Sequence, residues 1–161
     1  MPAAVAPDIA RLSRAVSALR AADAFAALLS PDEWRRLGEH LERREVDSGA
    51  LLIRRGDIDR HTYFVEDGEL QVFVVGGPPG SHRIAMLGAG AIVGEPALFG
   101  AGPRMAHVEA MAPAVVWGLS VERFDALAAA DPLLALAVLR AAGAVMAVRM
   151  RAQLERGIPL S

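Results

Sequence analysis

Cysteine is absent from the 161-residue chain, so the protein can build neither a disulfide framework nor a thiolate metal site. The chain also lacks an excess of charge of one sign. Seventeen basic and nineteen acidic residues leave a formal net charge of -2. The chain therefore lacks the excess of positive charge that is typical of proteins that bind nucleic acid. We therefore expect no direct binding to DNA, and the absence of cysteine is compatible with a reducing compartment.

Long uninterrupted apolar runs are missing as well. The first twelve residues, MPAAVAPDIARL, have neither the basic start nor the continuous apolar centre of a signal peptide. The most apolar stretch, residues 131–150, is interrupted by Arg140 and carries Arg149 near its end. It therefore contains no span of about 20 apolar residues such as a bilayer requires. We expect a cytoplasmic protein without membrane insertion.

The sequence does contain enough apolar material for one core. Hydrophobic residues make up 53% of the chain and charged residues 22%, which is typical of a single folded domain of this length. Apolar residues at steps of three and four predict an amphipathic helix over residues 8–29. Ser30 and Pro31, followed by two acidic residues, predict the start of a second helix.

The pattern changes after residue 41, where short β-branched and aromatic runs alternate with Asp-Gly, Gly-Asp, Gly-Gly and Pro-Gly turns. About eight such runs predict a sandwich or a small jelly-roll-like barrel. A helical period returns at Val121, and Pro132 opens a last helix that runs to about Leu154. The expected fold is mainly β with flanking α-helices: N-terminal helices over residues 1–41, an eight-stranded antiparallel barrel over 42–120, and C-terminal helices over 121–161.

One segment interrupts the strands and differs from its surroundings. It reads GEPALFGAGPRMAHV and spans residues 94–108. Pro96 is favoured in the first turn of a helix, so EPALFG predicts one short helical turn. A helix start presents free backbone N–H groups, here those of Ala97 and Leu98, and such groups favour an anion.

Two charged side chains flank this turn. Arg104 follows a Gly-Pro pair, and its planar fork of donors matches the oxygens of a phosphate. Glu95 carries a carboxylate, which accepts hydrogen bonds and therefore suits sugar hydroxyls rather than a phosphate. An acid, a base and a helix start in one segment together predict a site for a sugar phosphate.

In identity and spacing, the segment resembles the phosphate-binding cassette of the cyclic nucleotide-binding domain family. The family pattern is GE-x-AL followed by PR-x-A-x-V, and the residues that meet it are Gly94, Glu95, Ala97, Leu98, Pro103, Arg104, Ala106 and Val108. The stretches SGALLIRRGD, YFVEDGELQVFV and LGAGAIVGE also resemble the family. The resemblance therefore covers residues 19–150, which is nearly the whole chain.

The resemblance implies that Arg104 binds the cyclic phosphate and that Glu95 binds the ribose 2′-hydroxyl. Pro96 stands where the family usually has leucine or methionine. His107 stands where binders of cyclic GMP often carry threonine or serine, so we favour cyclic AMP slightly over cyclic GMP. The further ligand-binding positions that the resemblance implies are Gly94, Ala97, Leu98, Met105, Ala106 and His107.

The function implied by the resemblance is that of a cyclic nucleotide-binding sensor or regulatory domain. Such a domain is not an enzyme, needs no cofactor, and shifts its C-terminal helix when the nucleotide binds. Only seven residues follow Leu154, so we expect no DNA-binding domain there, and signalling would go to an unidentified protein partner. The last helix also suits a homodimer, because residues at steps of three and four form one seam; these are Leu136, Gly143, Ala147, Met150 and Leu154.

Three alternatives stay open at this point. Glu95 and Arg104 could form a buried ion pair that ties the cassette to the barrel. The chain could also be a ligand-free dimerisation or protein-interaction module that has kept the fold but not nucleotide binding. A small-barrel metalloenzyme is the third, although no metal-ligand spacing joins the four histidines and no serine or threonine lies in a nucleophile turn. The histidines are His40, His61, His82 and His107.

Overall fold

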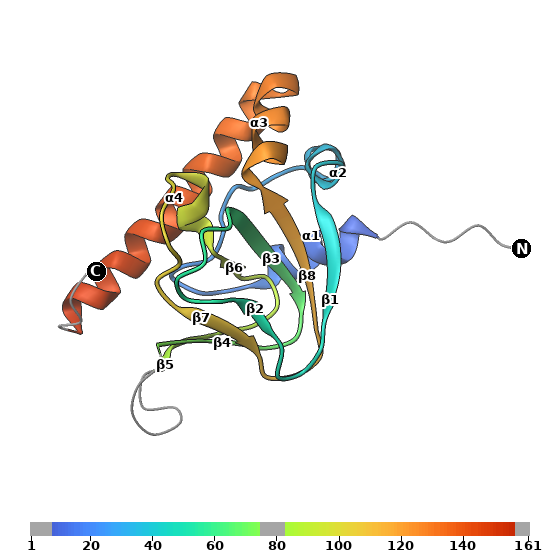
Figure 1. Ribbon diagram of the computed structural model, residues 1–161. Helices are drawn as coiled ribbons and strands as arrows, with labels where there is room; N and C mark the ends of the chain where they lie inside the picture. The colour runs from blue at the N-terminus through green and yellow to red at the C-terminus, as the bar shows by residue number, and fades with distance from the viewer. Residues whose placement is uncertain (1–7, 75–82, 157–161) are drawn as a thin grey trace, which may run out of the picture.

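The computed structural model describes residues 8–74 and 83–156. Two four-stranded antiparallel sheets form the centre of the fold (Figure 1). Helices that precede and follow the strands in sequence pack beside them. The fold expected from the sequence, mainly β with flanking helices, is confirmed. His82, one of the four histidines considered as metal ligands, lies outside the described residues.

The eight strands of the described residues are divided equally between the two sheets. The first sheet has the order β1-β8-β3-β6 and the second β2-β7-β4-β5, and each neighbouring pair is antiparallel. The strands of the first sheet are β1 (Glu42–Val46), β8 (Ala114–Ser120), β3 (His61–Asp67) and β6 (Ile92–Val93). Those of the second sheet are β2 (Leu51–Ile53), β7 (His107–Ala110), β4 (Leu70–Phe73) and β5 (Arg83–Leu87).

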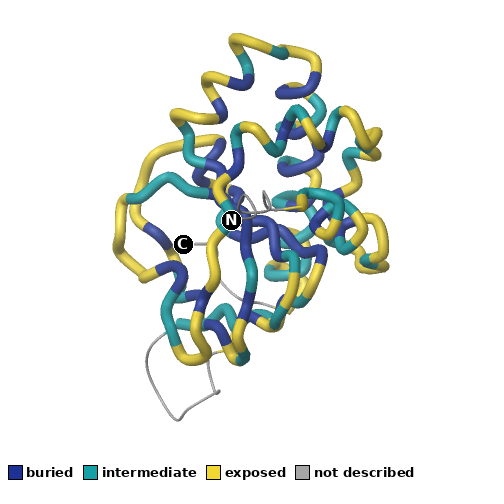
Figure 2. Tube along the Cα trace, turned by 90° about the vertical axis from the view of Figure 1, so that its right-hand side faces the viewer, coloured by how far each residue is buried: buried dark blue, intermediate teal, exposed yellow. Residues whose placement is uncertain are grey.

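The first sheet has a hydrophobic core on each face, and strand β3 contributes side chains to both. Successive side chains of a strand point to opposite faces, and Phe64 accordingly packs into the core shared with the helices. Val65 packs into the core between the two sheets, and both residues are fully buried. Figure 2 shows buried positions concentrated in the interior of the trace and exposed positions along its outer turns. The helices therefore cover one face of the first sheet, while the second sheet covers the other.

Two helices precede the sheets, and both begin at a capping side chain. They are α1 (Ile9–Ala18) and α2 (Pro31–Gly38). At α2 the Ser30 hydroxyl accepts from the Glu33 N–H at 3.1 Å, and the Glu33 carboxylate accepts from the Ser30 N–H at 3.0 Å. This reciprocal pair is a capping box, and the predicted helix start at Ser30 is confirmed.

Helix α1 is shorter than the range 8–29 expected from the sequence, and that expectation was wrong. The chain becomes extended at Leu19 and runs through residues 19–30 without helix or strand. Phe25 in this segment is buried, and its ring meets that of Phe64 edge to face, at a centroid distance of 5.0 Å. Burial of an aromatic ring against the core outweighs the modest helix preference of the surrounding alanines.

The C-terminal part contains three helical elements: η1 (Glu95–Leu98), α3 (Val121–Ala130) and α4 (Pro132–Glu155). Helix α4 passes beside η1 in Figure 1. A Cβ atom at Gly143 of α4 would lie 3.4 Å from Cζ of Phe99, so the small residue lets α4 approach the turn that follows η1. The last helix therefore packs directly on residues 94–108.

Helix α4 is long and apolar enough to cross a membrane by length and composition. The mean hydropathy of its 18-residue window is 1.8, and 33% of that window is buried. It is the one such helix among the described residues. From the sequence we expected no membrane-spanning segment here, because Arg140 interrupts the apolar stretch. A helix packed on the core of a soluble protein meets the same criterion, and α4 carries six buried residues that pack in this way: Leu134, Ala135, Val138, Ala141, Ala142 and Val145.

Candidate functional site

Residues 94–108 leave strand β6 and form the predicted short helical turn, which is a 3₁₀ turn. Gly94 has a φ of 77°, in the left-handed region. Its carbonyl accepts from the Thr62 hydroxyl at 3.1 Å and from Nη1 of Arg104 at 3.3 Å. A Cβ at Gly94 would lie 3.0 Å from that Nη1 and 3.0 Å from the His61 carbonyl oxygen. Glycine is therefore needed here for both its φ and its small size.

The N–H of Ala97 is not free, which corrects the expectation from the sequence. It donates to the Gly94 carbonyl at 3.2 Å, because a 3₁₀ turn bonds each N–H to the carbonyl three residues earlier. Ala97 and Leu98 are both buried, with 7% of their surface exposed. In this geometry the Ala97 N–H completes the turn instead of facing an anion.

Arg104 is buried beside Gly94 and uses every nitrogen of its guanidinium. Nε and Nη2 donate to the two carboxylate oxygens of Asp59, at 3.1 and 2.7 Å. Nη2 also donates to the His61 carbonyl, and Nη1 donates to the Gly94 carbonyl. These four hydrogen bonds fix the plane of the fork, since a bidentate pair restricts both distance and orientation.

The ion pair with Arg104 changes the pKa of Asp59. The Arg104 guanidinium, by its hydrogen bonds to Asp59, lowers the pKa of that carboxyl below its ordinary value, while partial burial acts in the opposite direction. Asp59 lies in the loop between β2 and β3. The same loop holds the Arg104 backbone, whose N–H donates to the Asp57 carbonyl at 2.7 Å and whose carbonyl accepts from the Gly56 N–H at 2.8 Å.

Glu95 is also buried, with 4% of its surface exposed, but its partner is not Arg104. Its Oε2 accepts from Nη1 of Arg149, on helix α4, at 2.9 Å. Arg149 also donates from Nε to Asp23 at 2.9 Å and from Nη2 to the Ile92 carbonyl at 2.7 Å. The alternative in which Glu95 and Arg104 neutralise each other is therefore wrong, because each is paired with a different residue.

The remaining predicted positions lie on the way to β7 and are less enclosed. Met105 is 47% exposed and Ala106 is half-buried. His107, the first residue of β7, accepts at Nδ1 from the Arg55 N–H at 3.2 Å, and its ring lies 5.2 Å from that of Phe73. The structure thus brings Gly94 and Arg104 into contact. His107 lies apart from them, beside the Arg55 backbone and the Phe73 ring of β4.

Four residues of this site were missed in the sequence: Asp23, Asp59, Thr62 and Arg149. Arg149 gave a usable signal, because a charge inside an apolar helix requires a partner when the helix is packed. Asp59 lies among the charged residues of GDIDRH, which give no local indication of the one that pairs with Arg104.

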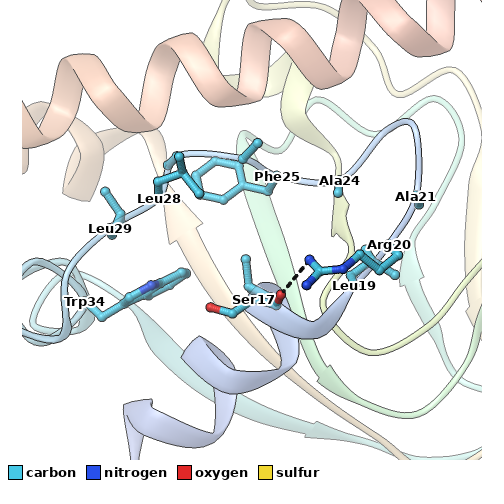
Figure 3. Close-up of a pocket in the computed structure, with 12 residues that line it drawn as sticks. Ser17, Leu19, Arg20, Ala21, Ala24, Phe25, Leu28, Leu29 and Trp34 are labelled. Atoms are coloured by element: carbon cyan, nitrogen blue, oxygen red, sulfur yellow. Dashed lines mark hydrogen bonds between the residues drawn. The ribbon is translucent and has the colours of Figure 1, made fainter.

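A pocket that none of the predicted site residues lines lies elsewhere in the protein. It measures about 330 Å³ and is lined by the end of α1, the segment that follows it, and Trp34 of α2. Figure 3 shows Phe25 and Trp34 among its lining residues, and Arg20, which donates to the Ser17 carbonyl at 3.3 Å. None of its lining residues belongs to residues 94–108, so this pocket is separate from the predicted site.

Comparison with known proteins gives a family for the chain. The family model described as "Cyclic nucleotide-binding domain" matches residues 43–131, more than half of the chain. The crystal structure of a cyclic nucleotide-binding domain from Methylobacillus flagellatus superposes with a TM-score of 0.76 at 24% identity. That match covers 95% of this chain and 85% of the other, and it shows the shared fold.

Two sequence relatives are much longer proteins. An uncharacterized protein of Mycobacterium tuberculosis is 41% identical over 101 residues, which are 62% of this chain and 18% of that protein. A cAMP-dependent protein kinase regulatory subunit of Blastocladiella emersonii is 34% identical over 91 residues, which are 56% of this chain and 23% of the subunit. The chain therefore spans less than a quarter of the length of these relatives.

Proposed function

Because the chain belongs to the cyclic nucleotide-binding domain family, we propose that it is a sensor that binds a cyclic nucleotide at residues 94–108. The observation that carries the proposal is the fixed, buried guanidinium of Arg104. Arginine has five N–H donors, and four hydrogen bonds of Arg104 are described. One N–H of Nη1, beside Gly94, has no partner among the described residues and is the donor for a phosphate oxygen.

The second half of the proposal assigns the sugar to Glu95. Its carboxylate lies one residue beyond Gly94, at the start of η1, and accepts hydrogen bonds from hydroxyls. A cyclic nucleotide presents a phosphate and a ribose 2′-hydroxyl on one rigid ring system, so Arg104 and Glu95 would bind it together. The other positions proposed to contact the nucleotide are Gly94, Leu98, Met105, Ala106 and His107, and Ala97 is no longer among them because the turn uses its N–H.

For the base we favour cyclic AMP over cyclic GMP. His107 offers no hydroxyl at the position where the family often uses one for guanine. The relative from Blastocladiella emersonii, 34% identical, is described as cAMP-dependent. On binding, the cassette would be drawn inward and helix α4, which packs on η1, would change position. The proposed domain is cytoplasmic and not catalytic, and it acts on a protein partner rather than on DNA.

Thermal melting and calorimetric titration test the binding step. A nucleotide at 100 times its dissociation constant adds about 2.7 kcal/mol to stability, which raises the midpoint by several degrees. Cyclic AMP, cyclic GMP and a cyclic dinucleotide are compared on the natural chain and on Arg104→Lys, which keeps the charge but loses the planar fork. Arg54→Lys, an exposed residue of the β2–β3 loop, is the matched control.

The expected result is binding of cyclic AMP that Arg104→Lys weakens and Arg54→Lys leaves unchanged. If none of the three nucleotides binds the natural chain, the interaction-module alternative stands instead. One observation favours that alternative in its own right, since helix α4 exposes large apolar side chains. They are Leu133, Leu136, Met150 and Leu154. A homodimer through α4 would bury these side chains, of which Leu136, Met150 and Leu154 belong to the predicted seam. Met150→Glu would then convert a dimer measured by light scattering into a monomer.

A further inference from the structure

The pocket at the end of helix α1 has the size of a site for a small organic molecule. It measures about 330 Å³ and is lined by residues 16–17, 19–21 and 24–29 together with Trp34. We call it the N-terminal pocket. Sites for small ligands begin at roughly 300 Å³. None of the lining residues belongs to residues 94–108, so a ligand bound here would not overlap the proposed nucleotide.

The inner wall of the N-terminal pocket is apolar and held in place by packing. Val16, Phe25 and Trp34 line it, and all three are buried. The rings of Phe25 and Trp34 both meet that of Phe64 edge to face, at centroid distances of 5.0 and 6.1 Å. Apolar walls give water few hydrogen-bond partners. This wall therefore suits the hydrocarbon body of a ligand better than it suits solvent.

Arg20 is the charged residue among those that line the pocket. Its Nη1 donates to the Ser17 carbonyl at 3.3 Å (Figure 3), and it makes no other hydrogen bond or ion pair within residues 8–74 and 83–156. Most of its five N–H donors are thus open. No acidic residue lines the pocket, and the neighbouring Asp23 is held by Arg149 at 2.9 Å. The charge of the pocket is therefore complementary to an anion.

Leu28 lines the same pocket and combines two unfavourable features. Its φ is 54°, in the left-handed region that side chains other than glycine seldom adopt. Its surface is 94% exposed, so the leucine gains little from burial in the unliganded chain. A backbone outlier of this kind often marks a functional segment. An apolar ligand in the pocket would give the Leu28 side chain a surface to pack on.

We propose that the N-terminal pocket binds a small apolar carboxylate. The carboxylate accepts two hydrogen bonds from the guanidinium of Arg20, whose planar fork matches two oxygens of one group. The hydrocarbon body lies against Phe25 and Trp34, and Leu28 packs over it. The chain then has a second ligand site, for a metabolite unrelated to nucleotides, on a segment without helix or strand.

The volume limits the size of this carboxylate. A water molecule occupies about 30 Å³ in the liquid, so the pocket holds the equivalent of roughly eleven waters. A ligand of about ten non-hydrogen atoms fits this space. Octanoate and 3-phenylpropanoate have this size, one with an aliphatic and the other with an aromatic body, and they are the probes for the test.

Calorimetric titration of the full chain tests the assignment of the two halves of the ligand. Octanamide keeps the body and loses the charge, whereas acetate keeps the charge and loses the body. Both should bind at least about tenfold more weakly than octanoate. Arg20→Gln should weaken octanoate about tenfold and leave octanamide unchanged. Arg14→Gln is the matched control, because Arg14 is exposed on the same helix and does not line the pocket.

A second variant fills the pocket without touching the charge. Ala24 lines the pocket and is half-buried, so the larger side chain of Ala24→Leu takes the place of the hydrocarbon body. We expect this variant to bind octanoate at least about tenfold more weakly and to melt no lower than the natural chain. Ala22→Leu, at an exposed position that does not line the pocket, should bind octanoate as the natural chain does.

The results that would overturn the inference are specific. Failure of both octanoate and 3-phenylpropanoate to bind the natural chain at millimolar concentration overturns it. Full affinity in Arg20→Gln or in Ala24→Leu also does so, because the carboxylate would then bind elsewhere on the surface. Arg104→Lys should bind octanoate normally, so the outcome here is independent of whether the chain binds a cyclic nucleotide.

Discussion

Arg104 and Asp59 form a two-point ion pair, with Nε and Nη2 of the arginine on the two oxygens of the carboxylate at 3.1 and 2.7 Å. The arginine is 9% exposed, and the aspartate side chain is 35% exposed. The pair ties residues 94–108 to the β2–β3 loop. The position of the guanidinium is therefore controlled by a carboxylate that lies 45 residues earlier in the chain.

Asp59→Asn should destabilise the protein by about 1–3 kcal/mol, because it leaves a buried guanidinium without its counter-charge. Urea denaturation at pH 7 measures the effect as a lower midpoint. Asp57→Asn is the matched control, since Asp57 is exposed and holds Arg104 through its backbone carbonyl. Equal midpoints for the two variants would show that the Asp59 pair contributes nothing to stability.

The same pair predicts a pH dependence. The pKa of Asp59 is lowered in the folded protein, chiefly by hydrogen bonds from Arg104, whereas the unfolded value lies near 3.9. A lowered pKa contributes stability that is fully present above the unfolded value and is lost as the pH falls through the folded value. The difference in unfolding free energy between the natural chain and Asp59→Asn should stay constant from about pH 7 to 5 and shrink below about pH 4. A difference that already disappears near pH 6 would contradict the assignment.

Gly94→Ala should lower stability by about 1–3 kcal/mol, because the position combines a φ of 77° with a Cβ that would lie 3.0 Å from Arg104 and His61. The added methyl group also pushes against the guanidinium assigned to phosphate. Calorimetric melting measures the loss. At Gly100 a Cβ would meet nothing within 4 Å, so Gly100→Ala should change stability by less than about 0.5 kcal/mol. A similar loss in both variants would show that neither the positive φ of Gly94 nor crowding beside it accounts for the effect.

Phe25→Ala should cost about 3–5 kcal/mol, although Phe25 lies in a segment without helix or strand. The ring is 4% exposed and packs on Phe64, so its removal leaves a cavity in the core beside the first sheet. The control in the same segment is Leu28→Ala, because Leu28 is 94% exposed, and its effect should be small. Chemical denaturation compares the two variants, and a small loss at Phe25 would show that segment 19–30 does not belong to the folded core.

Local features of the fold could be predicted from the sequence alone. The strands after residue 41, the cap at Ser30, and the short turn at Pro96 all follow from alternation, capping chemistry and proline geometry within a few residues. The helix that begins at Pro132 was predicted for the same reason. The cassette segment was also recognised, because its pattern lies within fifteen consecutive residues.

The sequence by itself determined that the cassette contains two charged side chains, Glu95 and Arg104. It did not determine which residues neutralise them. Their partners, Arg149 and Asp59, lie 54 and 45 residues away. Periodicity encodes the face of an element that is buried and says nothing of which distant side chain meets it. Folding of the sheets and the packing of α4 bring these groups together, and a charge removed from water then requires the particular partner that the packing supplies.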